Sequence, residues 1–524
     1  TAVSKVPGLR ERGSVVGEAL RKLFRSQPKI LRDLLTAVEE KPDDMKQLEP
    51  AIKEVTAVVA KVVGCADARR GVDRGLNCEL RPGLIGAWRE FVKDPDKEVE
   101  KWLVYGAPLG ILERPLDQGI FPLYTDQEAA QDITTVSGES WSEGRPCRAD
   151  RDPDALKEME TLRSHGWAKL YPSKVKAKMA VKGRLVLSEL FIIAKTKLKR
   201  VRNKVTQKIK KRLILNLKRS GVTGISVKTE RPELPRMLDV IFGNLEMWRR
   251  RRGCRLRHLV LDYSHAFFNF PNLPRERRYF ATKLQNHYWV WWRCTQGSRG
   301  APLICGRSLA LAMRLAIAAV PEFAANASTY VDDPIITVIG DEREQEENMG
   351  IIIACLLAMG FDLAFSKAQD SKREHVVTWT SGRVEILYDE EAIRVTVKED
   401  ILTELHENIN SMFTSNAVKV DDLRALAGRA TCVASLLHVW RPFVNMLWGP
   451  IFDLRSRCPF DQAKVWRKAV SIPLTWMRAF LLGTRGTLQR TYNLSSYLGE
   501  GDEVHIVADA SPTGLGAFLK VNGK

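Results

Sequence analysis

The chain has 524 residues, 44% of them hydrophobic, which is enough for sizeable cores and favours about two to four domains. Its formal charge of +19, from 82 basic and 63 acidic residues, favours a polyanionic partner such as nucleic acid or an anionic membrane. The nine cysteines include no Cys-x-x-Cys pair, which argues against a disulfide framework or a thiolate zinc site and predicts an intracellular protein, cytoplasmic or nuclear or both.

No apolar run predicts a membrane span. The most apolar stretch, around Leu309–Val320, is interrupted by Arg314 and closed by Pro321, so we expect no membrane partner. The sequence shows no signal-peptide pattern and begins at Thr1, which suggests a piece of a longer translation product.

Residues 1–150 predict helices joined by loops. Apolar residues recur at helical spacing in Ser14–Arg25 and Pro50–Val63, and polar residues dominate a predicted linker at Asp126–Asp154. We find no chemical motif here, and we interpret the region as a helical scaffold or an accessory nucleic-acid-binding arm of unknown role.

A very basic stretch follows the predicted helix Asp154–Gly166. Strands are predicted at Leu185–Ala194 and Arg212–Leu217, and the stretch from Lys195 to Arg219 holds twelve Lys or Arg and no acid. A second basic cluster lies at Arg249–Arg257. The first cluster interrupts a strand pair, so we place it on a hairpin tip that contacts phosphates through Lys208, Lys210 and Lys211. A solvated face or a nuclear-import signal is the alternative.

The middle of the chain carries acids at strand ends. His258–Asp262 is a short apolar strand ending in a carboxylate, Leu303–Val320 is a long apolar helix, and Thr329–Ile339 predicts a hairpin with Asp332 and Asp333 at its turn. Beyond it we expect helices at Glu342–Met359, Leu402–Phe413, Val420–Val439 and Gln462–Leu482, and strands at Val376–Trp379, Val384–Tyr388 and Val504–Ala508.

Two carboxylates on adjacent strands suit nucleotidyl transfer. That reaction needs two divalent cations, one to activate a primer 3′-hydroxyl and one to carry a triphosphate. Magnesium prefers carboxylate and phosphate oxygens, with Mn²⁺ as a substitute. An Asp-Asp pair alone is common in turns, so its context decides.

The context resembles reverse transcriptases over roughly residues 155–455. Leu261-Asp262-Tyr263-Ser264-His265-Ala266-Phe267-Phe268 resembles the first palm motif, Gln296-Gly297-Ser298-Arg299-Gly300-Ala301-Pro302 the second, and Tyr330-Val331-Asp332-Asp333 is similar to the hallmark Tyr-x-Asp-Asp. Gly360-Phe361 with Ser366-Lys367-Ala368-Gln369 resembles the fourth motif, and Arg212-Leu213-Ile214-Leu215-Asn216-Leu217-Lys218 resembles the fingers strand.

The resemblance implies a role for each matching position. Asp262 and Asp332 would ligate both metals, with Asp333 in support, and Lys367 would protonate the departing pyrophosphate. Phe267 would exclude a ribonucleotide 2′-hydroxyl, and Phe268 would point to the opposite side if the strand continued that far. The other implied nucleotide-binding residues are Lys195, Arg212, Gln296 and Tyr330.

The implied fold is α+β, a right-hand polymerase with fingers, palm and thumb around an antiparallel palm sheet, preceded by the mainly helical region 1–150. Fingers and palm would span 151–395, a thumb or connection 396–460, and a tether with the first strands of a ribonuclease H-like domain 461–524. The last assignment rests on Ala508-Asp509-Ala510-Ser511 and Gly514-Leu515-Gly516-Ala517. Polymerase, tether and nuclease in this order are typical of a retrotransposon polyprotein, of the LTR type or a tyrosine-recombinase element.

The implied activity is RNA-directed DNA polymerisation on a template–primer with dNTPs and two Mg²⁺ ions. Departures from the family pattern include His265, where an acid is frequent, and Pro334 directly after the Asp pair. One alternative is a viral RNA polymerase, which Tyr330 and Phe267 oppose. Another is a decayed or domesticated element that only binds nucleic acid.

Overall fold

The computed structural model describes residues 6–70, 79–124, 147–201, 204–455, 463–511 and 514–522; for 195–201, 204–210, 453–455, 510–511 and 514–515 it describes the backbone only. Helices and sheets are mixed along the chain. The chain forms two compact units, each assembled from separated segments. The first comprises 1–234, 261–334 and 346–368, and the second 235–260, 335–345 and 369–524.

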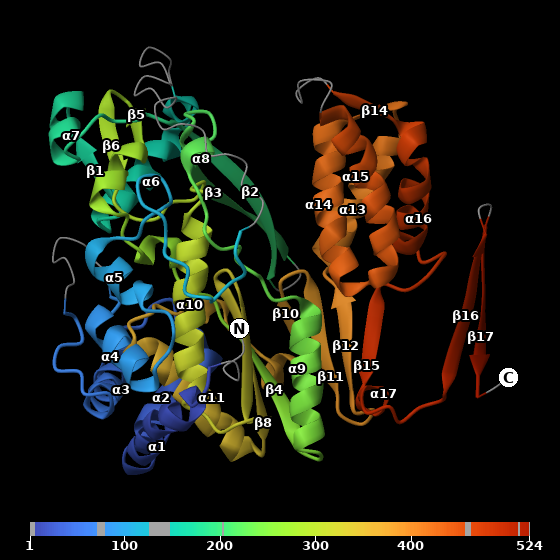
Figure 1. The fold of residues 1–524 in the computed structure, drawn as a ribbon, viewed down its shortest axis with the longest axis horizontal. Coiled ribbons are helices and arrows are strands. Elements are labelled where there is room, and N and C mark those ends of the chain that lie inside the picture. Colours follow the sequence, from blue (N-terminus) through green and yellow to red (C-terminus); the bar gives the residue numbers. More distant parts are fainter. Residues whose placement is uncertain are drawn as a thin grey trace. The chain divides into compact units, whose positions relative to one another are not determined.

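In the first unit, helices from the N-terminal region are gathered on one side of the long helix α10 (Ala301–Ala318) (Figure 1). These helices are α1 (Leu9–Ser26), α2 (Pro28–Glu40), α3 (Glu49–Val62), α4 (Pro82–Val92) and α5 (Glu98–Tyr105). The predicted helices Ser14–Arg25 and Pro50–Val63 are thus confirmed as α1 and α3. A side chain at Gly17 of α1 would collide with the Ala319 carbonyl oxygen, 1.7 Å from its Cβ, so the close approach of α1 to the end of α10 requires glycine there.

Helix α10 is long and apolar enough to span a bilayer by length and composition, but 83% of it is buried within the protein. The arginines that interrupt its apolar sequence are paired with buried acids. Arg307 Nε and Nη2 donate to Asp96 at 2.9 and 2.5 Å, and Arg314 Nε and Nη2 donate to Asp94 at 2.6 and 2.8 Å. These four side chains are buried, so the loop between α4 and α5 is tied to α10 by ion pairs without solvent.

The basic stretch forms a long antiparallel ribbon of β2 (Glu189–Val201) and β3 (Lys204–Asn216). The prediction of a basic connection between two shorter strands was therefore wrong. Lysines alternate with Thr196 and Leu198 in β2 and with Ile209 in β3, and this period of two continues both strands. The other strands described in this unit include β1 (Ala168–Tyr171), β5 (Ala281–Leu284) and β6 (His287–Trp291), in the order β1-β6-β5.

Two predicted elements include the positions at which the chain passes from one unit to the other. The hairpin predicted at Thr329–Ile339 is confirmed: β7 (Ala325–Tyr330) ends and β8 (Asp333–Gly340) begins on either side of the turn. Helix α11 (Glu342–Ala358) follows and is buried over most of its length, in agreement with the prediction of Glu342–Met359.

In the second unit, β4 (Arg255–Val260) pairs antiparallel with β8 from Ile335 onward and with β9 (Gln369–Asp370). A second sheet has the order β10-β11-β12-β15, from Val376–Trp379, Gly382–Leu387, Ala392–Val397 and Gln489–Asn493. One hydrophobic core joins this sheet to the helices α9 (Met237–Arg250), α13 (Glu399–Phe413), α14 (Val420–Leu436), α15 (Arg441–Arg455) and α16 (Ser471–Leu481).

The predicted helix Gln462–Leu482 is only partly correct. Lys464–Trp466 forms β14, which pairs with β13 (Ala417–Lys419), and the helical part begins only afterwards, with the 3₁₀ turn Arg467–Val470 and then α16. Val465 and Val418 stand opposite each other and are both buried, so pairing with a distant strand prevails over local helical periodicity. At the C-terminal end β16 (Val504–Ser511) pairs with β17 (Gly514–Val521), and Ile506 and Leu519 are 72% and 59% exposed.

Candidate nucleotidyl-transfer site

The two motif aspartates lie side by side in the first unit. The backbone N–H of Tyr263 donates to the Asp332 carbonyl at 2.9 Å, and the N–H of Leu261 donates to the Pro334 carbonyl at 3.0 Å. The segment around Asp262 therefore runs directly beside the hairpin turn, although the sequence separates them widely. This pairing brings the two carboxylates close enough to interact electrostatically.

The turn between β7 and β8 is strained. Val331 has a φ of 59°, in the left-handed region that a β-branched residue rarely adopts. Such strain persists only where the surrounding structure enforces it, and it concentrates at functional sites. Here it sits between Tyr330 and Asp332.

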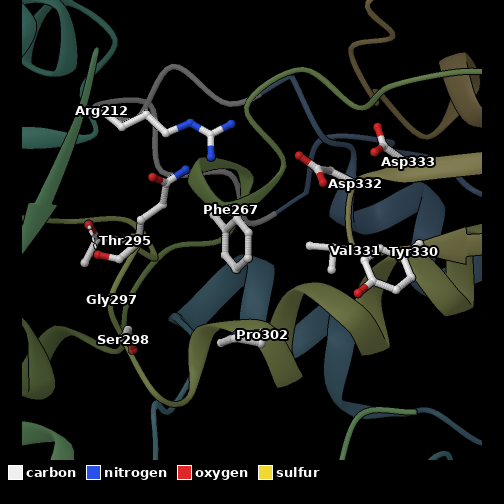
Figure 2. Close-up of a pocket in the computed structure, with 11 residues that line it drawn as sticks. Arg212, Phe267, Thr295, Gly297, Ser298, Pro302, Tyr330, Val331, Asp332 and Asp333 are labelled. Carbon is white, nitrogen blue, oxygen red and sulfur yellow. Dashed lines mark hydrogen bonds between the residues drawn. The ribbon is translucent and has the colours of Figure 1, made fainter. Parts of the chain in front are cut away.

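A pocket opens beside this turn (Figure 2). Figure 2 shows the Asp332 carboxylate on the side where the Arg212 guanidinium and the Phe267 ring lie. Eleven residues line it: Arg212, Phe267, Thr295, Gln296, Gly297, Ser298, Pro302, Tyr330, Val331, Asp332 and Asp333. Arg212, Phe267, Gln296, Tyr330, Asp332 and Asp333 were predicted as site residues, so the fold brings them together from four separate motifs.

Five lining residues were not predicted as site residues: Thr295, Gly297, Ser298, Pro302 and Val331. All five lie within or beside the quoted motifs, so proximity in sequence to Gln296 and Asp332 was the signal that could have found them. Gly297 has a φ of 99°, and a Cβ there would lie 2.6 Å from the Leu215 carbonyl oxygen of β3. Only glycine allows the Gln296 turn to approach the strand that carries Arg212.

Asp262 and Lys367 form an ion pair next to the pocket. Lys367 Nζ lies 2.6 Å from Asp262 Oδ1. Burial raises the pKa of Asp332 from its ordinary value, and the nearby Asp262 carboxylate raises it further, while Lys367 and Arg212 act in the opposite direction. The two carboxylates thus repel each other in a partly desolvated place, which is an environment that a bound cation would stabilise.

Phe267 and Phe268 lie in different surroundings, but the strand on which the expectation for Phe268 depended does not continue this far. Phe267 lines the pocket, whereas Phe268 stacks on Trp167 with ring centroids 4.5 Å apart and planes 4° from parallel. The backbone here is a 3₁₀ helix, Ala266–Asn269, and not a continuing strand. His265, just before it, has a φ of 53° and packs against Trp167 at 4.7 Å.

Of the lysines predicted to bind phosphate, only Lys211 has a described side chain. The side chains of Lys195, Lys208 and Lys210 lie outside the described residues, and the backbone register sets Lys195 opposite Lys210 and Lys197 opposite Lys208. Lys211 is described, and its Nζ lies 3.0 Å from Asp152 Oδ1 and 2.7 Å from Asp154 Oδ2. The hydrogen bonds that Lys211 donates to Asp154 and Asp152 raise its pKa, so its charge is already compensated within the protein.

Most arginines of the second basic cluster are also paired with acids. Arg249 and Arg250 bind Glu246, whose pKa falls to about 2 because of its hydrogen bond to Arg249 and further hydrogen bonds to Arg250 and Tyr497. Arg251, Arg252 and Arg257 pair with Glu344, Glu500 and Asp370, respectively. These arginines bind carboxylates of their own unit, which accounts for them without an external anion.

No protein family profile matches the chain, and no curated protein matches it in sequence. Among solved structures it is similar to a foamy viral protease-reverse transcriptase dRH in complex with double-stranded DNA, with 13% identity, a TM-score of 0.42, and coverage of 71% of this chain and 54% of that chain. A foamy viral protease-reverse transcriptase in complex with an RNA/DNA hybrid gives 14% identity, a TM-score of 0.43, and coverage of 72% and 42%. A foamy viral protease-reverse transcriptase in complex with double-stranded DNA gives 13% identity, a TM-score of 0.40, and coverage of 83% of this chain and 78% of that chain. The chain thus spans about half the length of the first two proteins.

Proposed function

We propose that this chain is an RNA-directed DNA polymerase of a retroelement, which transfers nucleotides from dNTPs to a primer 3′-hydroxyl by two-metal catalysis. The observation that carries the proposal is the hydrogen bond from Tyr263 N–H to the Asp332 carbonyl, because it places two motif aspartates together beside the pocket of Phe267, Gln296 and Arg212. The motif resemblance supplies the reaction class, and the paired aspartates beside a pocket support it.

Asp262 and Asp332 are the residues that would hold the metal ions, with Asp333 in support. Their mutual repulsion and partial burial suit cations. The described residues contain no cluster of three or more His, Cys, Asp or Glu that could hold a metal by itself, so phosphate oxygens and water would complete the coordination. Bound Mg²⁺ would activate the primer hydroxyl and stabilise negative charge on the triphosphate.

Arg212 and Lys367 would manage the phosphate charge. The guanidinium of Arg212 lines the pocket and can donate paired hydrogen bonds to phosphate oxygens. Lys367, whose side chain is 54% exposed, would supply a proton to the departing pyrophosphate. Gln296 would contact the base or the template, and Phe267 would lie beneath the sugar and exclude a 2′-hydroxyl.

The proposed organisation follows the sequence assignment. Fingers and palm would occupy 151–395, the thumb 396–460, and a tether with the opening strands of a ribonuclease H-like domain 461–524, as in a retrotransposon polyprotein. The exposed apolar residues of the β16–β17 hairpin, such as Ile506 and Leu519, are consistent with strands that need further partners. Lys208 and Lys210 would contact the template–primer, and the protein would act in the cytoplasm, the nucleus or both.

The decisive experiment is extension of a DNA primer on an RNA template with dNTPs. Extension should require Mg²⁺ or Mn²⁺, and Asp332→Asn or Asp262→Asn should reduce it by about three orders of magnitude, because each loses several kcal/mol of metal-mediated stabilisation. Template binding and the circular dichroism spectrum should be unchanged. Asp389→Asn, at an exposed acid outside the site, is the control and should extend like wild type.

Two outcomes would contradict the proposal. Wild-type protein that binds template–primer but never extends it would favour the alternative, a decayed element that only binds nucleic acid. Free use of rNTPs by the wild type would favour an RNA polymerase.

A further inference from the structure

The pair of Lys367 and Asp262 has a consequence for metal binding. Its 2.6 Å separation is that of a direct hydrogen-bonded ion pair. The exposed fractions of the two side chains are 54% for Lys367 and 19% for Asp262, so the ammonium sits at the solvent side of a mostly enclosed carboxylate. The ammonium therefore covers the accessible side of an acid that we propose as a metal ligand.

The backbone holds this lysine in place. The N–H of Ala364 donates to the carbonyl oxygen of Asp262 at 2.8 Å, and a 3₁₀ turn, Phe365–Lys367, leads from there to the lysine. On the same side the Ser264 N–H donates to the Asp362 carbonyl at 2.9 Å. The segment that carries Lys367 is thus attached to the segment that carries Asp262, so their encounter is built into the backbone.

A divalent cation bound to Asp262 would be repelled by the Lys367 ammonium on the same carboxylate. Like charges a few ångströms apart repel strongly when the site is partly desolvated. The same carboxylate therefore has two competing counter-ions, one supplied by the chain and one from solution.

We propose that Lys367 is the resident counter-ion of the metal-free site and is exchanged for the metal when the site is loaded. No covalent bond changes in this step: the ammonium leaves the Asp262 oxygen, and the cation takes its place. The released ammonium, on an exposed side chain, is then free to meet an anionic leaving group. This inference rests on the proposed function, since it assigns Lys367 a positioning role at the same aspartate.

The test is a Mn²⁺ titration of the whole chain without nucleic acid or nucleotide, followed by electron paramagnetic resonance of free Mn²⁺. Lys367→Met removes the competing charge and should tighten Mn²⁺ binding by roughly tenfold or more. Lys367→Arg keeps the charge and should bind Mn²⁺ as weakly as wild type. Asp262→Asn should abolish the lysine-sensitive site.

Lys372→Met is the matched control. Lys372 pairs with the Glu342 carboxylate outside the pocket, so its loss should leave Mn²⁺ affinity unchanged. A second readout is thermal stability: Lys367→Met should melt below wild type in EDTA, because Asp262 loses its partner, and Mn²⁺ should close the gap.

Unchanged or weaker Mn²⁺ binding by Lys367→Met would overturn the exchange. Equal tightening by Lys372→Met would overturn it as well, since the effect would then be a general change in charge. The proposed function fails separately. Metal-dependent extension with no Lys367 effect on Mn²⁺ rejects the exchange alone, whereas lysine-sensitive Mn²⁺ binding without any extension rejects the polymerase alone.

Discussion

The arginines of α10 and the arginine of the pocket differ in what surrounds them. Arg307 and Arg314 are buried and bound to Asp96 and Asp94, and Arg307 also lies 3.2 Å from Glu230. Arg212 is exposed at the pocket, and none of the described carboxylates forms an ion pair with it. A charge that has carboxylate partners inside the fold serves stability, and a charge that faces an open pocket without them is available to a ligand.

The same distinction separates two neighbouring phenylalanines, and it also applies to the basic clusters of the sequence. Phe268 stacks on Trp167, whereas its neighbour Phe267 faces the pocket. Arg249 and Lys211 are paired with nearby acids, although in sequence they belong to clusters that suggest phosphate binding. Charge density along a sequence therefore predicts a ligand less well than the absence of a partner in the fold.

The largest effect is expected at a buried arginine. Arg307→Met should lower the free energy of unfolding by about 3–5 kcal/mol, because Asp96 and Glu230 remain as unpaired buried carboxylates. Urea denaturation followed by circular dichroism measures this. Arg249→Met, at a partly exposed pair with Glu246, should lower the free energy of unfolding far less, because solvent screens that pair. Similar losses in the two variants would break the comparison.

Arg212→Met should show the opposite pattern. The free energy of unfolding should stay near wild type, while KM for dNTPs rises by about 10–100-fold, the value of a charge-assisted hydrogen bond of about 1.5–3 kcal/mol. Steady-state primer extension at varied dNTP concentration gives KM. A destabilised Arg212→Met with normal KM would place Arg212 among the structural arginines.

Among the aromatic residues, Phe267→Ala should raise use of rNTPs relative to dNTPs by roughly 10–100-fold, because overlap with a 2′-oxygen in a packed site costs about 1–3 kcal/mol. Phe268→Ala should destabilise the protein, since the stack on Trp167 is lost, without changing the ratio. Single-nucleotide incorporation with paired rNTP and dNTP measures the ratio. Equal ratios in both variants would remove the sugar-selecting role from Phe267.

The smallest effect concerns stability at Asp332. Its pKa is raised in the folded protein, first by burial and then by Asp262, so the folded state binds this proton more tightly than the unfolded state. Wild-type stability contributed by this group therefore falls as pH rises through that pKa, and it is retained below the ordinary value of 3.8. In EDTA, Asp332→Asn should melt slightly above wild type at neutral pH, and this gain should vanish in acid. A variant that melts below wild type at neutral pH would contradict the expected repulsion.

Local patterns in the sequence were sufficient for much of the site. The hairpin with acids at its turn follows from β-branched residues around Asp332 and Asp333, and the pocket gathers residues from the quoted motifs. Helices such as α1, α3 and α11 follow from periodicity. These features depend on residues that are close together in the sequence.

Features that depend on distant partners could not be predicted. The pairing of Lys464–Trp466 with Ala417–Lys419 and the ion pairs of Arg307 and Arg314 join residues that share no local signal. The capture of Phe268 by Trp167 is of the same kind. The lysine ribbon is a different case, because its period-two alternation was present but was outweighed by its charge.

Because Asp94 precedes Arg314 by a long stretch of chain, it is synthesised well before the arginine with which it pairs. The two residues are 220 positions apart, and Asp96 and Arg307 are 211 apart. At typical translation rates, the acids emerge from the ribosome about 10–45 s before their arginines. During that interval Trp88 and Trp102, which are buried in the finished fold, also lack the helix α10. A nascent chain that stops before residue 314 therefore presents unpaired acids and bare tryptophans, the features by which chaperones and proteases select incomplete products.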